Sequence, residues 1–375
     1  MKTQGSATIA GPGPERLEAV RSAFLSGART YGDLGSPLYR ALCTAGADDE
    51  ALLEIASHAQ QGAQPAFHLL ASVHFLLLDD PSQPLARFYA TVSDAPAHPD
   101  GAFDHFAAFC RAQRDAILEI MATRTVQTTY VERCGILLPL ISAVAEAAGE
   151  PLDLIEMGCS AGILLTLDKY AYALDDGRTL GSPDAPFTVD CVVRDGPPIA
   201  IPQIGRRIGL DLNPLDVRDE TERQWLVALS LPELRYERRR LLAALDTVSE
   251  SGIELRKGDA LELIDDALAD TPGPLCVYHS ACLSYWPQDA RDALEEKLRQ
   301  ASRTRDIYRA GIEAPAAACA WHTGSSGSKA GTRSPAGITS ELSLARYRNG
   351  KAEHAVISQG PIFGPFDWTG SAPWS

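Results

Sequence analysis

The sequence contains no apolar run long enough to cross a bilayer, which takes about 20 consecutive residues. The apolar stretches are short, and one of them, residues 73–78, is interrupted by His74 and ends at two aspartates. The first five residues include no apolar segment, so we expect no secretory signal. These absences predict a protein that neither spans nor binds a membrane.

Closely spaced cysteines are also missing. The eight cysteines are scattered without a C-x-x-C pair, and no histidine pair has the spacing of zinc ligands. In a chain of 375 residues, this pattern is more typical of buried free thiols than of a disulfide framework. His68 and His74 lie in an apolar segment and fit core histidines better than metal ligands. We therefore expect no metal site, and a reducing, cytoplasmic location.

Positive charge is scarce. Lys and Arg number 34 against 49 Asp and Glu, which gives a formal net charge of −15 at pH 7. A negative field repels phosphate backbones, so nucleic acid is a poor candidate partner. The basic run at residues 238–240 fits a solvated helix face better than a nucleic-acid site. Hydrophobic residues make up 45% of the chain, which excludes a disordered protein, and nothing in the pattern sets the oligomeric state.

Residues 1–149 are expected to form an all-helical region that caps the rest of the chain. From residue 15 onward, apolar residues recur at spacings of three and four, which is the period of an amphipathic helix. Pro, Asp and Gly cluster at residues 79–81 and 94–101, where we expect loops.

Residues 150–375 change to a pattern in which strands alternate with helices. Such alternation predicts βαβ units and a parallel sheet. The predicted strands are residues 152–157, 207–212, 253–257, 275–279 and 307–312, and the predicted helices are 163–173, 219–229, 233–248, 260–269 and 287–302. Two strand-like runs, 338–347 and 351–358, flank Asn349-Gly350, which is a hairpin signal that would make the sheet mixed.

Two segments interrupt this doubly wound α/β domain. Residues 175–203 form a polar, Gly- and Pro-rich insert with one strand-like piece at 187–193. Residues 314–337 contain the small-residue run 324–331, which is typical of a flexible linker or lid. We expect the insert and the lid to cover a site in the domain.

The most informative segment is residues 154–162, where a predicted strand enters a turn. Small residues occupy the alternate positions Gly158, Ser160 and Gly162, and a helix is expected to follow. Such a turn lets the backbone approach a ligand closely and aims helix N–H groups at it. By itself, glycine in this kind of turn often serves packing alone.

Polar residues also end the strands that follow. Asp211 ends one strand and could accept both ribose hydroxyls of a nucleoside, and Asp259 follows the next strand, where an adenine amino group could donate to it. Asp259 also precedes a helix and is a plausible N-cap. His279 ends a further strand and is a candidate base or a structural histidine. Because ligands of open α/β sheets bind at such strand ends, we expect these side chains to share one site.

At these residues the sequence resembles class I S-adenosylmethionine-dependent methyltransferases. The first motif of that family, acid-x-Gly-x-Gly-x-Gly, corresponds here to Glu156-x-Gly158-x-Ser160-x-Gly162. Ser160 departs from the motif and leaves less room at the turn. The 211 − 162 = 49 residues from Gly162 to Asp211 also exceed the usual spacing of about 20, because the insert lies between them.

Residues 152–290 resemble more closely a bacterial family known as domain of unknown function twenty-three thirty-two. The matching segments are 156–162, 168–170, 209–216 and 279–280, and the helical N-terminal region also fits. The resemblance implies a Rossmann-like methyltransferase fold, but it brings no reaction with it.

The sequence thus predicts binding of S-adenosylmethionine and methyl transfer to a small-molecule substrate. Glu156, Gly158, Ser160 and Gly162 would shape the cofactor turn, while Asp211 would bind ribose, Asp259 the adenine end, and His279 would act as base. Tyr278, Tyr285 and Glu313 could face the same crevice or simply pack.

Two other functions remain open. One is a nucleotide-binding scaffold that transfers no methyl group. The other is a serine hydrolase, because residues 158–162 match G-x-S-x-G and place Ser160 ahead of Asp211 or Asp259 and then His279. Against the hydrolase, which needs several strands before its nucleophile, the region before residue 152 is predicted to be helical, and no His-Gly-Gly oxyanion motif lies upstream.

Overall fold

The structure, a computed structural model, describes residues 13–127, 129–315, 339–361 and 364–374. It divides into two compact units. The helical unit comprises Met1–Thr128 with Glu220–Arg239, and the sheet unit comprises Thr129–Asp219 with Arg240–Ser375. Within the ranges that the structure describes, no helix is long and apolar enough to span a membrane.

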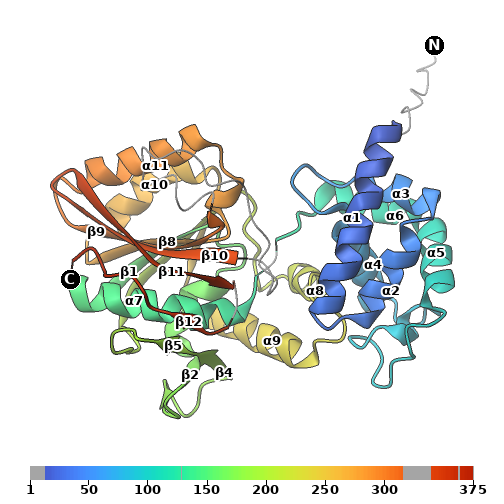
Figure 1. Cartoon of the computed structure of the whole chain (residues 1–375), viewed down its shortest axis with the longest axis horizontal. Helices are drawn as coiled ribbons and strands as arrows, with labels where there is room; N and C mark the ends of the chain where they lie inside the picture. The colour runs from blue at the N-terminus through green and yellow to red at the C-terminus, as the bar shows by residue number, and fades with distance from the viewer. Residues whose placement is uncertain (1–12, 128, 316–338, 362–363, 375) are drawn as a thin grey trace. The chain divides into compact units, whose positions relative to one another are not determined.

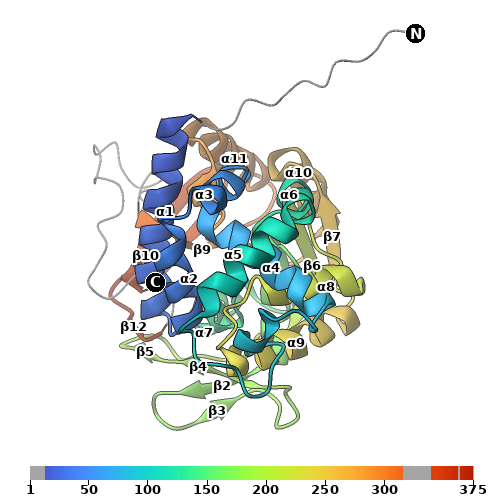
Figure 2. The ribbon, with the colours of Figure 1, turned by 90° about the vertical axis from the view of Figure 1, so that its right-hand side faces the viewer.

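The helical unit is built around α4, which contacts α1, α3, α6 and α8 (Figure 2). Proline at the first turn starts α1, α2 and α4, and the side chain of Asp49 caps α3. The helices are α1 (Pro14–Asp33), α2 (Pro37–Gly46), α3 (Glu50–Ala56), α4 (Pro65–Asp79), α5 (Ala102–Ala112), α6 (Arg114–Thr123), α8 (Glu220–Ala228) and the start of α9 (Arg235–Glu250). This confirms the predicted N-terminal helical region.

The two buried histidines of α4 are core residues, as predicted. A ring nitrogen of His68 lies 3.1 Å from the carbonyl oxygen of Arg124. The two ring nitrogens of His74 lie 2.7 Å from Thr91 Oγ1 and 3.1 Å from the carbonyl oxygen of Ala228. Through these contacts His74 attaches α8 to α4, although Ala228 lies 154 positions beyond His74 in the chain.

A seven-stranded mixed sheet forms the core of the sheet unit. Its order is β11-β10-β9-β8-β1-β6-β7, in which β1, β6, β7, β8 and β9 are parallel and β10 is antiparallel to both of its neighbours. The strands are β1 (Leu152–Met157), β6 (Ile204–Asp211), β7 (Glu254–Lys257), β8 (Leu275–Ser280), β9 (Ile307–Glu313), β10 (Thr339–Arg348) and β11 (Lys351–Pro361). The hairpin turn has φ values of 52° at Asn349 and 77° at Gly350. The predicted α/β architecture with a C-terminal hairpin is thus confirmed.

Helices cover both faces of this sheet. Figure 1 shows α7 (Cys134–Ala148) on one face and α10 (Ala260–Asp270) with α11 (Gln288–Ala301) on the other. Ile155, Met157 and Val277 belong to the apolar cluster with α10 and α11. Since successive side chains in a strand alternate between faces, Glu156 and Tyr278 face the α7 side. This alternation decides which polar groups can meet at the ends of the strands.

The helix predicted at residues 163–173 is wrong. A 3-10 helix, η3 (Ile163–Lys169), follows β1, and its backbone is non-helical at Thr166. Strand β2 (Ala171–Leu174) then begins a small sheet with β3 (Thr179–Leu180) and β4 (Thr188–Cys191), while β5 (Val193–Arg194) pairs with β12 (Phe366–Asp367). The predicted strand-like piece at 187–193 thus corresponds to β4 and the start of β5. The predicted lid, 314–337, lies outside the described residues except for its first two positions.

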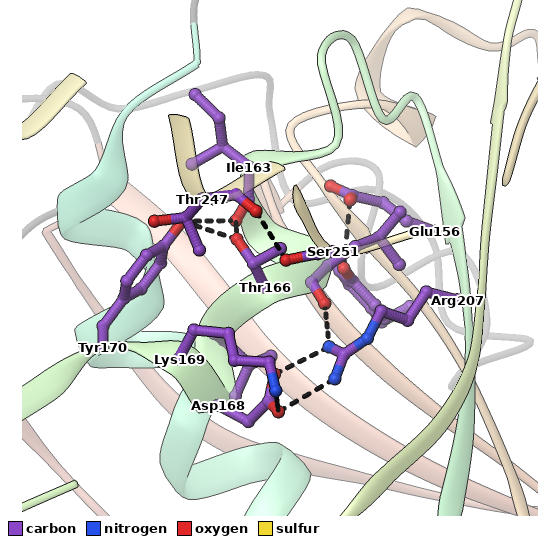
Figure 3. A network of polar contacts seen from close by, with 12 residues as sticks. Glu156, Ile163, Thr166, Asp168, Lys169, Tyr170, Arg207, Thr247 and Ser251 are labelled. Atoms are coloured by element: carbon purple, nitrogen blue, oxygen red, sulfur yellow. Dashed lines mark hydrogen bonds and ion pairs between the residues drawn. The ribbon is translucent and has the colours of Figure 1, made fainter. Parts of the chain in front are cut away.

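Side-chain hydrogen bonds explain why no α-helix forms after β1 (Figure 3). The carbonyl oxygen of Ile163 accepts from the hydroxyl groups of Thr166 at 2.8 Å and Tyr170 at 3.1 Å. The carbonyl oxygen of Leu165 accepts from Arg207 Nη1 at 2.5 Å. These bonds occupy the carbonyl groups that a growing helix would use, which is how side chains compete with helical hydrogen bonding.

Candidate functional site

The carboxyl ends of the parallel strands bring most of the predicted site residues to one edge of the sheet. Strand β1 lies between β6 and β8, and Glu156 pairs in register with Gly209 on one side and Tyr278 on the other. Along the chain, β6 and β7 follow on one side of β1. The chain then crosses to the other side of β1, where β8 pairs with it. The turn at 158–162 and the ends of β6, β7 and β8 therefore share this edge.

The turn after β1 has a left-handed backbone at three alternate positions. The φ values are 72° at Gly158, 50° at Ser160 and 77° at Gly162. A Cβ atom at position 158 would lie 2.6 Å from Cys282 Sγ, so only glycine lets the turn contact the loop after β8. Ser160 carries the conformational strain expected of a side chain in the left-handed region.

Asp211 holds this turn in place. Its Oδ2 accepts the backbone N–H of Ser160 at 2.8 Å, and its Oδ1 accepts the N–H of Asn213 at 2.8 Å. The side chain is largely buried. The acid that was predicted to bind ribose therefore also fixes the predicted cofactor turn.

Asp259 follows β7, whose last residue Lys257 pairs with Asp211, and has a clear structural role. Its Oδ1 accepts the N–H of Leu261 at 2.8 Å and caps α10, which confirms the predicted N-cap. The preceding residue, Gly258, donates its N–H to the carbonyl oxygen of Asp211 at 2.9 Å. The side chain of Asp259 is exposed, so its second oxygen can still receive a ligand.

Glu156 is a buried acid at the end of β1. It is 2% exposed and accepts the hydroxyl group of Tyr278 at 3.0 Å. Burial raises the pKa of the Glu156 carboxyl group well above its usual range, and the negative charge of Asp211 adds to this effect. The Tyr278 hydrogen bond and the charge of Arg133 act in the opposite direction.

His279 forms a buried pair with Glu313, at the end of β9. The two residues meet between Nδ1 and Oε1 at 2.8 Å. Burial lowers the pKa of His279, although the Glu313 hydrogen bond opposes the shift. Burial alone would raise the pKa of Glu313, but hydrogen bonds from His279 and Ser284 lower it overall. An ionised Glu313 beside a neutral His279 places the ring proton on Nδ1 and leaves Nε2 as the acceptor.

The surroundings of His279 restrict what its Nε2 can reach. This atom is buried and has no hydrogen-bond partner among the described residues. The ring lies over Gly311 of β9, where a Cβ atom would be 2.6 Å from Cε1 and 3.1 Å from Nε2. Since β9 and β1 flank β8 on opposite sides, the ring extends away from the turn at 158–162.

Glu313 also organises the loop that follows β8. Besides His279, it accepts the N–H groups of Cys282, Leu283 and Ser284, each at 3.0 Å, and the Ser284 hydroxyl group at 2.6 Å. These bonds hold the loop against the turn, where Cys282 meets Gly158. From the sequence, Glu313 could either face the crevice or simply pack. The structure shows that it anchors the loop after β8.

Three further residues at this edge were not predicted as cofactor ligands. Leu212, directly after Asp211, is 73% exposed, and Tyr285, in the loop after β8, is 77% exposed. Arg133 is 7% exposed and precedes α7. An apolar residue directly after the strand-ending acid was a usable signal for Leu212. The burial of Arg133 depends on tertiary packing, for which the sequence carries no signal.

A second polar cluster lies away from the strand ends, on the side of β6 that faces η3. Figure 3 shows Arg207 and Asp168 pointing toward one another, joined by bonds of 2.6 and 2.8 Å. Both side chains are buried, and the pair attaches η3 to β6. A surface cavity of about 430 Å³ lies beside it and is lined in part by Lys169, Thr247 and Ser251.

Within the described ranges, no group of three or more His, Cys, Asp or Glu side chains could hold a metal ion. The seven cysteines in those ranges are free thiols, and all but the half-buried Cys282 are buried. The prediction of buried free thiols is confirmed for these residues.

The chain belongs to the family of uncharacterized proteins conserved in bacteria, DUF2332, whose model matches residues 21–368. This confirms the family resemblance stated from residues 152–290 and extends it over both units. No protein of curated function matches the sequence.

Proposed function

We propose that this protein binds S-adenosylmethionine at the carboxyl edge of the parallel strands and transfers its methyl group to a small molecule. The strand order supports this proposal. Counted along the chain from β1, the five parallel strands lie in the order 3-2-1-4-5, which is the order of doubly wound nucleotide-binding folds. Ligands of such sheets bind where the order reverses, here between β1 and β8.

The observation that carries the proposal is the bond between Asp211 and Ser160. It makes the glycine-rich turn and the strand-ending acid a single rigid unit. An acid at the end of this strand is the group that accepts the ribose hydroxyl groups in doubly wound nucleotide-binding folds. Leu212, which is exposed beside it, offers an apolar surface on which a flat base can pack.

The site fits an adenosyl sulfonium better than a phosphate-containing dinucleotide. Phosphates bind where free N–H groups at a helix N-terminus face them. Here the N–H of Ser160 is bonded to Asp211, and a 3-10 helix replaces the α-helix that would follow. The carboxylate of Asp211 beside the turn also disfavours an anionic phosphate and favours a cationic ligand.

When bound, S-adenosylmethionine would supply an electrophilic methyl group on its sulfonium centre. The protein would contribute mainly by holding the acceptor in line with this group, because proximity and orientation can provide most of such a rate enhancement. Asp211 would orient the ribose, and the exposed oxygen of Asp259 would receive the adenine amino group. His279 is the candidate base, with Nε2 as the proton acceptor that Glu313 fixes.

Isothermal titration of the full chain with S-adenosylmethionine and S-adenosylhomocysteine tests the proposal. Asp211→Asn should weaken both ligands about 10- to 100-fold, because hydrogen bonds to a charged carboxylate are lost. Asp216→Asn is the matched control, since Asp216 lies in the same loop and its side chain accepts hydrogen bonds from Arg218. The proposal is overturned if the wild-type chain binds neither ligand, or if the two variants behave alike.

The orientation of His279 favours a second candidate function, a protein that binds the cofactor without methyl transfer. Its ring extends away from the turn, over Gly311. A screen with methyl-labelled S-adenosylmethionine separates the two functions, because a scaffold would bind the cofactor and label no acceptor. The serine-hydrolase alternative has less support, because Asp211 accepts the backbone N–H of Ser160 and His279 pairs with Glu313.

A further inference from the structure

Arg133 is a buried cation that has no hydrogen-bond or ion-pair partner among the described residues. Its side chain is 7% exposed, and its Nε is buried without a hydrogen-bond partner. Across the described ranges, neither a hydrogen bond nor an ion pair to this guanidinium is found. Burying a charge without a partner costs free energy, so buried charges in proteins are normally paired with a group of opposite charge.

The carboxylates around Arg133 are already engaged with other groups. Glu132, its neighbour in the chain, pairs with Arg240 at 3.2 Å. Glu156 accepts from Tyr278, and Glu313 accepts from His279 and the loop after β8. Burial lowers the pKa of Arg133, and the charges of Glu313 and Glu156 act against that shift without contacting the guanidinium directly.

Two features orient Arg133 toward an anion. The guanidinium lies 5.6 Å from the centre of the Tyr130 ring, which is the geometry of a cation–π contact and restricts the side chain. Arg133 is also the N-cap residue of α7, a helix of 15 residues whose positive end favours negative charge. A planar guanidinium matches a carboxylate group with two parallel hydrogen bonds.

We infer that Arg133 is the receptor for a carboxylate group of the ligand that binds at the carboxyl edge of β1 and β8. The identity of that ligand rests on the proposed function. The carboxylate has two possible sources: the amino-acid end of S-adenosylmethionine, or a methyl acceptor that is itself a carboxylic acid. In both cases Arg133 selects a ligand that carries a carboxylate group, either on the sulfonium side or on the acceptor side of the transferred methyl group.

Titration of the full-length wild type, Arg133→Gln and Arg133→Lys with two adenosyl ligands distinguishes the sources. S-adenosylhomocysteine has the carboxylate, and 5′-methylthioadenosine lacks it. If Arg133 binds the cofactor, Arg133→Gln weakens S-adenosylhomocysteine about 10- to 100-fold and leaves methylthioadenosine unchanged. Arg133→Lys retains the charge but cannot form the two parallel hydrogen bonds of a guanidinium, so a partial loss of affinity for S-adenosylhomocysteine is expected. Arg218→Gln, at an exposed arginine, is the control and should change neither affinity.

A second arm tests the acceptor and is independent of the cofactor. Thermal unfolding is followed in sodium acetate and in sodium chloride of equal ionic strength. If Arg133 binds the acid of an acceptor, acetate raises the Tm of the wild type above its value in chloride, and Arg133→Gln loses this difference while keeping wild-type affinity for S-adenosylhomocysteine. The same acetate result in a chain that binds no adenosyl ligand would support the carboxylate receptor and reject the proposed function.

The inference is overturned if Arg133→Gln is folded and matches the wild type in both arms. If Arg133→Gln does not fold, unchanged behaviour of Arg133→Lys overturns it.

Discussion

The carboxylate of Asp211 accepts the backbone N–H of Ser160 at 2.8 Å, so the acid that ends β6 fixes the turn that follows β1. The two residues are 51 positions apart, and the small sheet of β2, β3 and β4 lies between them in the chain. Loss of either strand end would therefore disturb the other, and Asp211 and the turn at 158–162 form one structural element.

Ser160→Gly should keep the affinity for S-adenosylhomocysteine within about threefold, because glycine adopts the φ of 50° at this position more easily and retains the N–H that Asp211 accepts. Ser160→Val should lower the free energy of unfolding by about 1–2 kcal/mol, since a β-branched residue is strained in the left-handed region. Isothermal titration and urea unfolding measure the two effects. Covalent labelling of Ser160 by a fluorophosphonate that Ser160→Gly abolishes would contradict this view and favour a hydrolase.

Gly158→Ala should destabilise the protein by about 2–4 kcal/mol, because backbone strain is combined with a clash against Cys282. Gly177→Ala is a matched control: its φ of 82° is similar, but nothing lies within 4 Å of the added Cβ. Urea unfolding of both variants separates the clash from the strain. Equal losses would show that the turn does not press against the loop after β8.

The His279–Glu313 pair predicts loss of stability in acid, in two steps. The folded pKa of His279 is below its unfolded value of about 6.5, so its contribution is complete above that pH and falls as the pH decreases. Glu313 also has a lowered pKa, and its contribution is lost below its unfolded value of about 4.3. Urea unfolding between about pH 7 and 5 should show a shallower decline for His279→Gln than for the wild type. Parallel curves would mean that His279 is not buried as a neutral ring.

Asp168→Asn should cost about 3–5 kcal/mol of unfolding free energy, because it leaves the buried charge of Arg207 uncompensated. The double variant Asp168→Leu with Arg207→Met should recover much of that loss. Asp216→Asn, at an exposed pair with Arg218, should change stability by less than about 1 kcal/mol. A double-mutant cycle in urea gives the coupling energy, and a value near that of the exposed pair would contradict the structural role of Asp168.

The strand ends could be predicted from the sequence because buried parallel strands leave a local pattern. Apolar runs at 152–157 and 275–279 ended at polar residues, and Asn349-Gly350 marked the hairpin. The helix after Gly162 was predicted wrongly for a physical reason. The hydroxyl group of Thr166 and the guanidinium of Arg207, which lies about 40 residues away, occupy carbonyl groups that a helix needs.

The site itself could be predicted only in part. Asp211 and the turn were found because their residue types and strand-end positions are visible in sequence. The direction of the His279 ring was not, since it depends on the missing side chain of Gly311 in a neighbouring strand. Arg133 illustrates the same limit, because the absence of a partner is a property of packing.

The carboxylate of Glu313 gathers five donors from one short segment of the chain, residues 279–284. Glutamine at this position would place its own N–H donors against the N–H and O–H donors that Glu313 accepts. Aspartate is one methylene too short to reach the same donors. A saturation library at codon 313 should therefore yield glutamate almost exclusively among folded clones, so that selection would mark a scaffolding residue as strictly as any that handles a substrate.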